Sequence, residues 1–571
     1  MNNLLERLKV NKYSMFKHGT VAVICMFTTW IFFGVKNIMI AFPIALTSSL
    51  LSRYNINVKP VQKYFKIVTL DIILVLLAYI SSLNLVLGFI INLITIFFIM
   101  YLVISPYDLS FYKPFLMLYI FTQYASISFY ELPSRILTII FGMLIIFIGN
   151  SINRINEKSI LGSSIVKSIK LLYEQFDNII VYRYDPNIEL KITNMMRDLA
   201  YRVYITRYRK YLTTNIGRYQ FKIFLSLEHF NISVKNIYEL YKNDNLNAEV
   251  IGQFQLVMEY ILLYSQGALT LNDILRYLNN LREDHLEDKD SIVYDTIENL
   301  LVLGENILAI EKIGKKEVHK VFTEWEKGDF DSLKTTFKEY LNVNSIRFRF
   351  SVRMSITLAI IIFIAEYLGF YKVIWAIITV MSIMQPYYED TIKRTKDRIV
   401  GNTIAIIFTG VLINLINNKY VTILVLILSL FLLYGYKDYS KISLFAATAS
   451  ICVSSLSENI NKLIFYRVSY IVVGVVAILL VNKYIFPYKL NEGIIHLEEK
   501  IIKLNNILED INYNTNIYEV RDLILHITLL CQKLYIRNEK YKDNSVSSFI
   551  ERYTSNSINK GYEILYDMGS W

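Results

Sequence analysis

The chain has 571 residues, of which 54% are hydrophobic, 14% are aromatic and only 19% are charged. A water-soluble protein of this length normally carries more charge. The composition therefore indicates a membrane protein and excludes a chain that is disordered over most of its length. Lys and Arg outnumber Asp and Glu by 60 to 49. In a membrane protein this excess belongs in cytoplasmic loops, so no nucleic-acid partner is expected.

Twelve apolar stretches of membrane-spanning length fall into two blocks of six. The basic start of the chain is long and lacks a small-residue cleavage site, so the first stretch is expected to remain as a helix. The predicted fold class is an all-α, polytopic membrane protein. The predicted helices cover residues 17–34, 37–52, 66–84, 86–104, 112–130 and 134–151, then 350–369, 371–386, 399–417, 420–435, 440–457 and 465–486.

Basic residues predict the orientation of these helices, because Lys and Arg collect in cytoplasmic loops. With the N-terminus inside the cell, two such loops follow the second and eighth predicted helices, and both are basic. They contain Arg53, Lys59, Lys63 and Lys66, and Lys393, Arg394, Lys396 and Arg398. We therefore expect an inner-membrane protein with both termini cytoplasmic. Its domains are expected at 1–151 (membrane), 152–346 (cytoplasmic), 347–487 (membrane) and 488–571 (cytoplasmic tail).

The two blocks share residues at a constant offset of 332 positions, which indicates an internal duplication. Copies of six helices each would be parallel, so the sequence predicts two six-helix bundles with a cavity between them, as in a transporter or channel. The matching pairs are Arg135 and Arg467, Gly142 and Gly474, Asn150 and Asn482, Tyr107 and Tyr439, and Lys66 and Arg398.

Apolar residues at helical spacing predict that the middle segment and the tail are helical as well. In the tail they alternate at three and four residues from Ile494 to Ile511, which fits a coiled-coil-like seam or a helix packed on the middle segment. We expect one helical cytoplasmic body. Its simplest role is a scaffold and dimerisation surface, which would make the protein a homodimer.

Nothing in the sequence predicts an enzyme, a cofactor or a metal site. The cysteines Cys25, Cys452 and Cys531 lie far apart, and the six histidines form no ligand motif. GxxxxGK[ST] and GxSxG do not occur. Any transport would therefore be driven by an ion gradient or by the gradient of the substrate itself.

The stretch 375–410 contains the most informative chemistry. A helix is expected to end at Pro386, a basic loop follows, and a new helix starts near Gly401. Cations at a helix start would attract carboxylates or other anions to the cytoplasmic mouth. The equally weighted alternative is anchoring to anionic lipid headgroups. The candidate binding residues are Thr391, Arg394, Arg398, Thr403, Trp375 and Lys66.

The same stretch resembles the second membrane module of the fusaric acid resistance (FUSC), or aromatic acid exporter, family. The resemblance is carried by a tryptophan–threonine helix, a "QP…T..R…R..GT" loop and a late "R……G" helix that ends at proline. In this sequence the corresponding residues are Trp375, Thr379, Gln385, Pro386, Thr391, Arg394, Arg398, Gly401, Tyr439, Arg467, Gly474 and Pro487. The motifs are specific over about 350–490, whereas the order of blocks covers the whole chain.

Two departures from the family pattern affect what can be carried over. Gly401 is followed by Asn402 before Thr403, where the family usually has Gly-Thr, and residues 41–68 of the first block keep little of the loop motif. An anion site is therefore expected to be asymmetric. The family implies efflux of aromatic carboxylic acids or related weak acids, and a similar module occurs in plant anion channels.

Ionisable residues within predicted helices require an explanation, because they are costly in a bilayer. Asp71 is the candidate for proton coupling, with a static ion pair to Lys66 or Arg398 as the alternative. Glu366 is expected at the outer interface, and Arg135 and Arg467 have the same alternative. Trp375 is a candidate contact for a ring-bearing substrate, with core packing as its alternative.

The leading functional hypothesis is a secondary exporter of organic anions, with aromatic or lipophilic carboxylates entering at Arg394 and Arg398. Small organic anions and membrane lipids are the expected ligands. The alternatives are a passive anion channel gated by the cytoplasmic helices and a membrane scaffold that transports nothing.

Overall fold

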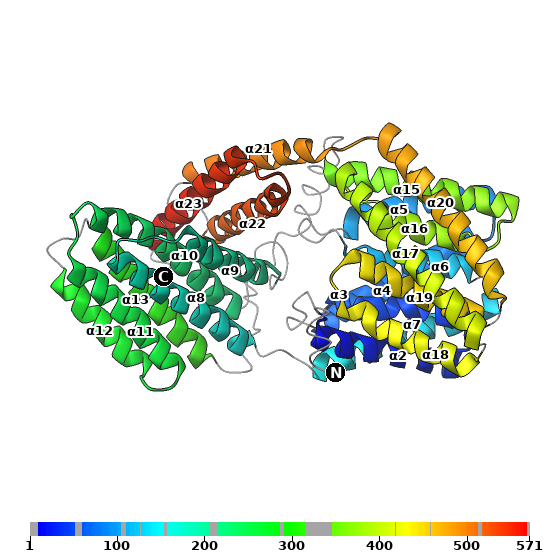
Figure 1. Cartoon of the computed structure of the whole chain (residues 1–571), viewed down its shortest axis with the longest axis horizontal. Helices are drawn as coiled ribbons and strands as arrows, with labels where there is room; N and C mark the ends of the chain where they lie inside the picture. Colours follow the sequence, from blue (N-terminus) through cyan, green and yellow to red (C-terminus); the bar gives the residue numbers. More distant parts are fainter. Residues whose placement is uncertain are drawn as a thin grey trace. The chain divides into compact units, whose positions relative to one another are not determined.

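The computed structural model describes residues 10–51, 60–103, 110–125, 127–152, 157–205, 215–285, 291–313, 345–416, 418–456, 458–511 and 517–567. Within these ranges the fold is all-helical and contains no strand, as the sequence predicts (Figure 1). Of the residues used in the sequence predictions, Tyr107, Arg53 and Lys59 lie outside the described ranges.

Each of the twelve predicted apolar stretches coincides with one helix. The first block consists of α2 (Lys12–Phe33), α3 (Val35–Leu51), α4 (Pro60–Ser81), α5 (Leu85–Val103), α6 (Lys113–Tyr124) and α7 (Leu132–Ile152). The second consists of α15 (Ile346–Leu368), α16 (Ile374–Ile383), α17 (Tyr388–Ile416), α18 (Lys419–Gly435), α19 (Tyr439–Ser455) and α20 (Ile460–Tyr484).

Not all of these helices have the predicted spanning length. In the described residues, seven helices are long and apolar enough to cross a membrane: α2, α4, α5, α7, α15, α17 and α20. The prediction of a span over 371–386 is wrong, because α16 has only 10 residues and a helix of that length covers about 15 Å of a bilayer core of about 30 Å. Pro386 follows three residues after Ile383, the last residue of α16.

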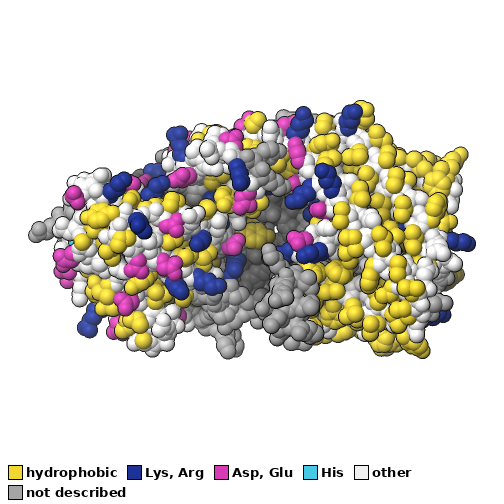
Figure 2. All heavy atoms as spheres, in the orientation of Figure 1, with side chains coloured by type: hydrophobic (Ala, Val, Ile, Leu, Met, Phe, Trp, Pro, Cys, Tyr) yellow, Lys and Arg dark blue, Asp and Glu magenta, His cyan; other side chains and the backbone are white. Residues whose placement is uncertain are grey.

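The chain divides into two compact units. The membrane unit comprises Met1–Tyr54, Pro60–Arg154 and Leu333–Gly493, and the helical unit comprises Asn55–Lys59, Ile155–Ser332 and Ile494–Trp571. Exposed large apolar side chains are numerous on the membrane unit, for example Ile404, Phe408 and Val411 on α17. Figure 2 shows hydrophobic side chains over most of its visible face. Such a surface requires an apolar solvent.

In the membrane unit, the first helix of each block packs along the fourth helix of the other block. α5 lies along α15, and α18 lies along α2. The two blocks therefore interlock, and these pairings do not show the two separate bundles that the sequence predicted. Hydropathy locates helices in the chain, but it contains no information about which helices pair.

The duplication extends to contacts that the sequence comparison did not include. Thr47 and Thr379 are also offset by 332 residues, and each hydroxyl donates to the carbonyl four residues earlier. Gly142 and Gly474 permit equivalent close packing: a Cβ at Gly142 would lie 2.9 Å from Ile44 on α3, and one at Gly474 would lie 3.0 Å from Thr379 on α16.

The helical unit is formed by the middle segment and the tail around one hydrophobic core. The tail positions with heptad-like spacing face this core, since Leu497, Ile501 and Leu508 are buried and Ile494 and Ile511 pack against it. The tail helix therefore packs against the core that the middle segment and the tail share. The helices are α8 (Glu157–Ile180), α9 (Pro186–Ile205), α10 (Asn215–Lys242), α11 (Ala248–Ser265), α12 (Leu271–Asp284), α13 (Ile292–Lys312), α21 (Leu490–Glu509), α22 (Ile517–Tyr541) and α23 (Asn544–Asp567).

Candidate functional site

One face of α17 carries most of the candidate chemistry. The buried residues of this helix recur every three or four positions, so they form a single stripe that faces the protein. The opposite side carries exposed apolar residues such as Ile399 and Ile407. The buried stripe consists of Thr391, Thr395, Arg398, Gly401, Asn402, Ala405 and Thr409.

The predicted start of this helix was wrong. α17 begins at Tyr388, and its first turn contains Glu389 and Asp390. Arg394 and Arg398 therefore lie in the second and third turns, so the positive end of the helix dipole does not reinforce their charge. The hydropathy pattern marked only where the apolar part of the helix begins, whereas the polar turns before it are helical too.

Gly401 allows α17 to approach α19 closely. A Cβ at this position would lie 2.6 Å from the carbonyl oxygen of Ser440 and 3.0 Å from the backbone nitrogen of Leu444. Both neighbours are backbone atoms that cannot move aside by rotating a side chain. The close approach brings Ser443 on α19 within hydrogen-bonding distance of Asn402.

We expect Gly401→Ala to lower the free energy of unfolding by about 1–3 kcal/mol, because the new methyl group overpacks the contact between α17 and α19. Thermal unfolding of detergent-solubilised protein would measure this loss. Gly252→Ala in α11 is the matched control, because a Cβ at Gly252 would meet no atom within 4 Å and alanine favours a helix interior over glycine by about 1 kcal/mol. Equal melting temperatures for the two variants would contradict the packing role of Gly401.

Arg467 on α20 is held in the interior by polar and aromatic contacts. It is 2% exposed. Its Nε donates to Oδ1 of Asn402 at 3.1 Å, and its Nη1 donates to Oγ of Ser450 at 3.1 Å. Its guanidinium carbon lies 5.2 Å from the ring centre of Trp375. These partners hold Arg467 inside the protein, so the alternative of an interfacial side chain does not describe it.

Arg398 lies one helical turn before Asn402, which accepts the hydrogen bond from Nε of Arg467. Its side chain is 3% exposed, and its Nε is buried without a hydrogen-bond partner. Within the described ranges, neither arginine forms an ion pair with a carboxylate. We call Arg398 and Arg467 the arginine pair. A buried charge without a counter-ion costs several kcal/mol, so this arrangement favours a bound anion.

Arg394 lies one helical turn before Arg398 on the same side of α17 and is half-buried. Its guanidinium carbon is 4.6 Å from the ring centre of Tyr439, and its Nη1 donates to the carbonyl of Ser382 at 3.4 Å. The Tyr439 hydroxyl is buried without a partner in the described structure. Arg394 and Arg398 thus form a short row of cations that leads toward Arg467.

The loop between α16 and α17 is held by hydrogen bonds to its backbone. The Thr391 hydroxyl accepts from the backbone nitrogen of Gln385 at 3.0 Å and donates to the carbonyl of Tyr387 at 3.0 Å. Arg353 on α15 donates from Nη2 to the carbonyl of Pro386 and from Nη1 to Asn482 at 2.8 Å. Thr391, predicted as a binding residue, therefore closes the loop with its hydroxyl.

Three other predicted residues lie apart from the arginine pair. Lys66, the counterpart of Arg398 in the repeat, is exposed on α4, and Thr403 is exposed on α17. The buried neighbour of Thr403 is Asn402, which the sequence analysis noted only as a departure from the family. Asp71 is buried on α4, and no hydrogen bond or ion pair between it and Lys66 or Arg398 occurs in the described part of the chain.

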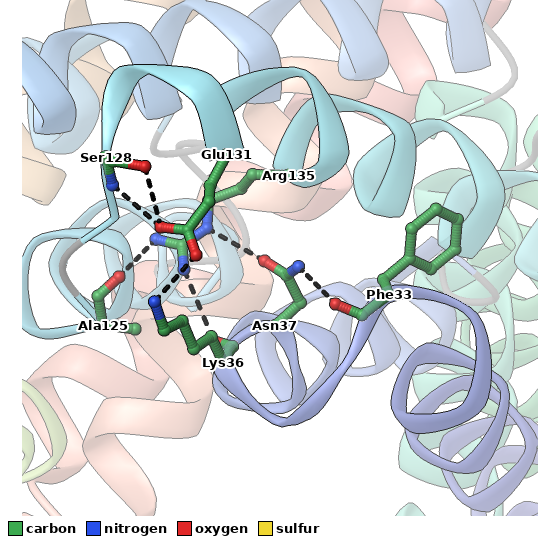
Figure 3. A network of polar contacts seen from close by, with 7 residues as sticks. All are labelled: Phe33, Lys36, Asn37, Ala125, Ser128, Glu131 and Arg135. Carbon is green, nitrogen blue, oxygen red and sulfur yellow. Dashed lines mark hydrogen bonds and ion pairs between the residues drawn. The ribbon is translucent and has the colours of Figure 1, made fainter.

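Arg135 is the residue of the first block that corresponds to Arg467. It is buried, and all three nitrogens of its guanidinium group donate hydrogen bonds. Its Nε donates to Asn37 at 3.1 Å, and its terminal nitrogens donate to the carbonyls of Thr122, Ala125 and Lys36. Figure 3 shows the guanidinium between Asn37 and Ala125. The two arginines thus differ: Arg135 is satisfied by backbone carbonyls, whereas Arg467 lies beside a second cation. The alternative of an interfacial side chain does not describe Arg135 either, because it is fully buried.

The helical fold, the apolar surface and the candidate spans define a multi-pass helical membrane protein. A family model described as "Fusaric acid resistance protein-like" matches residues 358–481. The match lies within the second block and supports the resemblance to the FUSC family seen in its motifs. A domain of this family indicates a membrane transporter or exporter rather than an enzyme. No curated protein and no solved structure gives a significant match to the chain.

Proposed function

We propose that this protein exports organic anions, most suitably aromatic or other lipophilic carboxylates, across the inner membrane. The observation that carries the proposal is the arginine pair, two buried arginines that are linked through Asn402 and have no carboxylate partner in the described chain. A bound carboxylate would supply the missing negative charge and accept hydrogen bonds from the guanidinium groups. Trp375, which already stacks on Arg467, would lie beside the ring of an aromatic substrate.

The proposed route starts on the cytoplasmic side at Arg394. The substrate carboxylate would pass from Arg394 to Arg398 and then to Arg467, so that each step exchanges one cation for the next. The basic residues after the second and eighth helices support cytoplasmic termini and this direction of entry. Asp71 is proposed as the proton carrier, because it is a buried carboxylic acid for which no ion-pair partner appears in the described residues.

We expect Arg398→Ala to reduce export of 4-hydroxybenzoate by about tenfold or more, because one of the two charges that attract the carboxylate is lost. Radiolabelled 4-hydroxybenzoate flux in proteoliposomes with an imposed proton gradient would measure this. Lys393→Ala is the matched control, since Lys393 is an exposed cation on the same helix.

Unchanged flux in Arg398→Ala would show that the proposed route is wrong. Planar-bilayer recording distinguishes the exporter from a passive channel. Discrete anion currents at fixed voltage would identify a channel, whereas saturable flux that depends on the proton gradient supports an exporter. Absence of both would favour a scaffold without transport activity.

A further inference from the structure

We propose that Asn402 is a positioning residue that determines the charge preference of the anion site. This inference rests on the proposed function, because it concerns how the arginine pair remains available to a carboxylate. Asn402 is 1% exposed. It lies on α17, one turn after Arg398; its amide donates to the backbone carbonyl of Arg398 and accepts from the guanidinium of Arg467.

The hydrogen bonds of Asn402 define the orientation of its amide. The Nδ2 group donates to the carbonyl of Arg398 at 2.8 Å and to Oγ of Ser443 at 3.1 Å. Because both partners accept at this end, Oδ1 must point the other way, where it accepts from Nε of Arg467 at 3.1 Å. The side-chain amide therefore orients the Arg467 guanidinium without being able to rotate.

The neutrality of this partner is as important as its geometry. An aspartate at the same position could accept the same Nε–H, but it would form an ion pair with Arg467 in the protein interior. Such a pair would cancel one positive charge of the arginine pair, and a buried pair of this kind is strongly held. The amide orients Arg467 and leaves both positive charges for a ligand.

The first block lacks this arrangement. The residue equivalent to Asn402 is Leu70, whose side chain has no hydrogen-bonding group, and the residue equivalent to Arg398 is Lys66, which is exposed. The Nε of Arg135 donates to the side-chain amide of Asn37 on α3, and its terminal nitrogens donate to backbone carbonyls. A neutral amide that holds one buried arginine and lies one turn after a second is thus a feature of the second block, where the anion site is proposed.

The test compares Asn402→Asp with Asn402→Ser in proteoliposomes that transport radiolabelled 4-hydroxybenzoate. We expect the aspartate variant to raise KM by about tenfold or more, with a much smaller change in kcat, because anion binding is weakened before transport begins. The serine variant keeps the position neutral and should keep KM within about threefold of wild type. Calorimetric titration of detergent-solubilised protein with 4-hydroxybenzoate should show the same ranking of affinities.

Unchanged KM in Asn402→Asp, or equal increases in both variants, would overturn the inference while leaving the proposed function intact. If wild-type protein neither binds nor moves 4-hydroxybenzoate, the proposed function fails and the inference with it. If Asn402→Asp does not yield a monodisperse protein, Ser450→Asp introduces the same charge at the partner of Arg467 Nη1. This second variant should raise KM in the same way, and an unchanged KM would again overturn the inference.

Discussion

Replacing Arg467 with methionine is expected to reduce organic-anion export by about 100-fold, because a hydrogen bond to a charged ligand contributes up to about 3 kcal/mol. Stability should also fall, because the buried Oδ1 of Asn402 and Oγ of Ser450 lose their donor, but part of this loss should be offset. Methionine has a similar length, and replacing a buried charge by an apolar group of similar volume is often neutral or stabilising. Flux in proteoliposomes and thermal unfolding in detergent would measure the two effects separately.

Arg135→Met is the matched control, since Arg135 and Arg467 occupy the same position in the two blocks. Arg135 donates to Asn37 and to three backbone carbonyls. Its removal should leave buried acceptors unpaired at about 1–3 kcal/mol each. We therefore expect lower stability but nearly normal flux per folded molecule. If the two variants behaved alike, the functional difference between the two arginines would be refuted.

The second large effect is expected for Arg353→Met. Arg353 is fully buried and holds both the carbonyl of Pro386 and the side chain of Asn482. Losing two hydrogen bonds from a charged donor should cost about 3–6 kcal/mol. The loop between α16 and α17 should then open more readily. Hydrogen exchange of the amides from Gln385 to Thr391, together with the melting temperature, would measure the change.

Lys396→Met provides the control for Arg353→Met, because Lys396 is an exposed cation on α17. It should leave both the melting temperature and the exchange of this loop unchanged. Slow exchange from Gln385 to Thr391 in Arg353→Met would show that the Thr391 hydroxyl and the tyrosine packing at Tyr387 and Tyr488 hold the loop without the arginine.

The sequence predicted where the helices lie along the chain better than it predicted their lengths or which helices pack together. Apolar runs located all twelve helices because each run is bounded by polar or breaking residues. The same runs could not show that α17 extends back to Tyr388, since its first turns are polar. They also could not show the pairing of α5 with α15, because residues that face lipid and residues that face another helix are equally apolar.

The candidate site was only partly predictable. Arg398 and Trp375 were predicted from the motif, and both are buried beside Arg467. Arg353 was missed, although a cation inside an apolar run is costly and indicates a specific partner. Asn402 was noted only because it interrupts the Gly-Thr pair. Its position on the buried stripe of α17, in helical phase with Arg398, is the signal that could have identified it.

The interlocked pairing of the two blocks constrains how the chain is assembled during synthesis. α2 ends at Phe33, but its partner α18 starts only at Lys419, and α5 must likewise wait for α15. The first block therefore enters the bilayer with two helix faces still uncovered. The ribosome must deliver the chain as far as Gly435 before both faces are covered, so maturation of the first block depends on synthesis of helices that follow the middle segment.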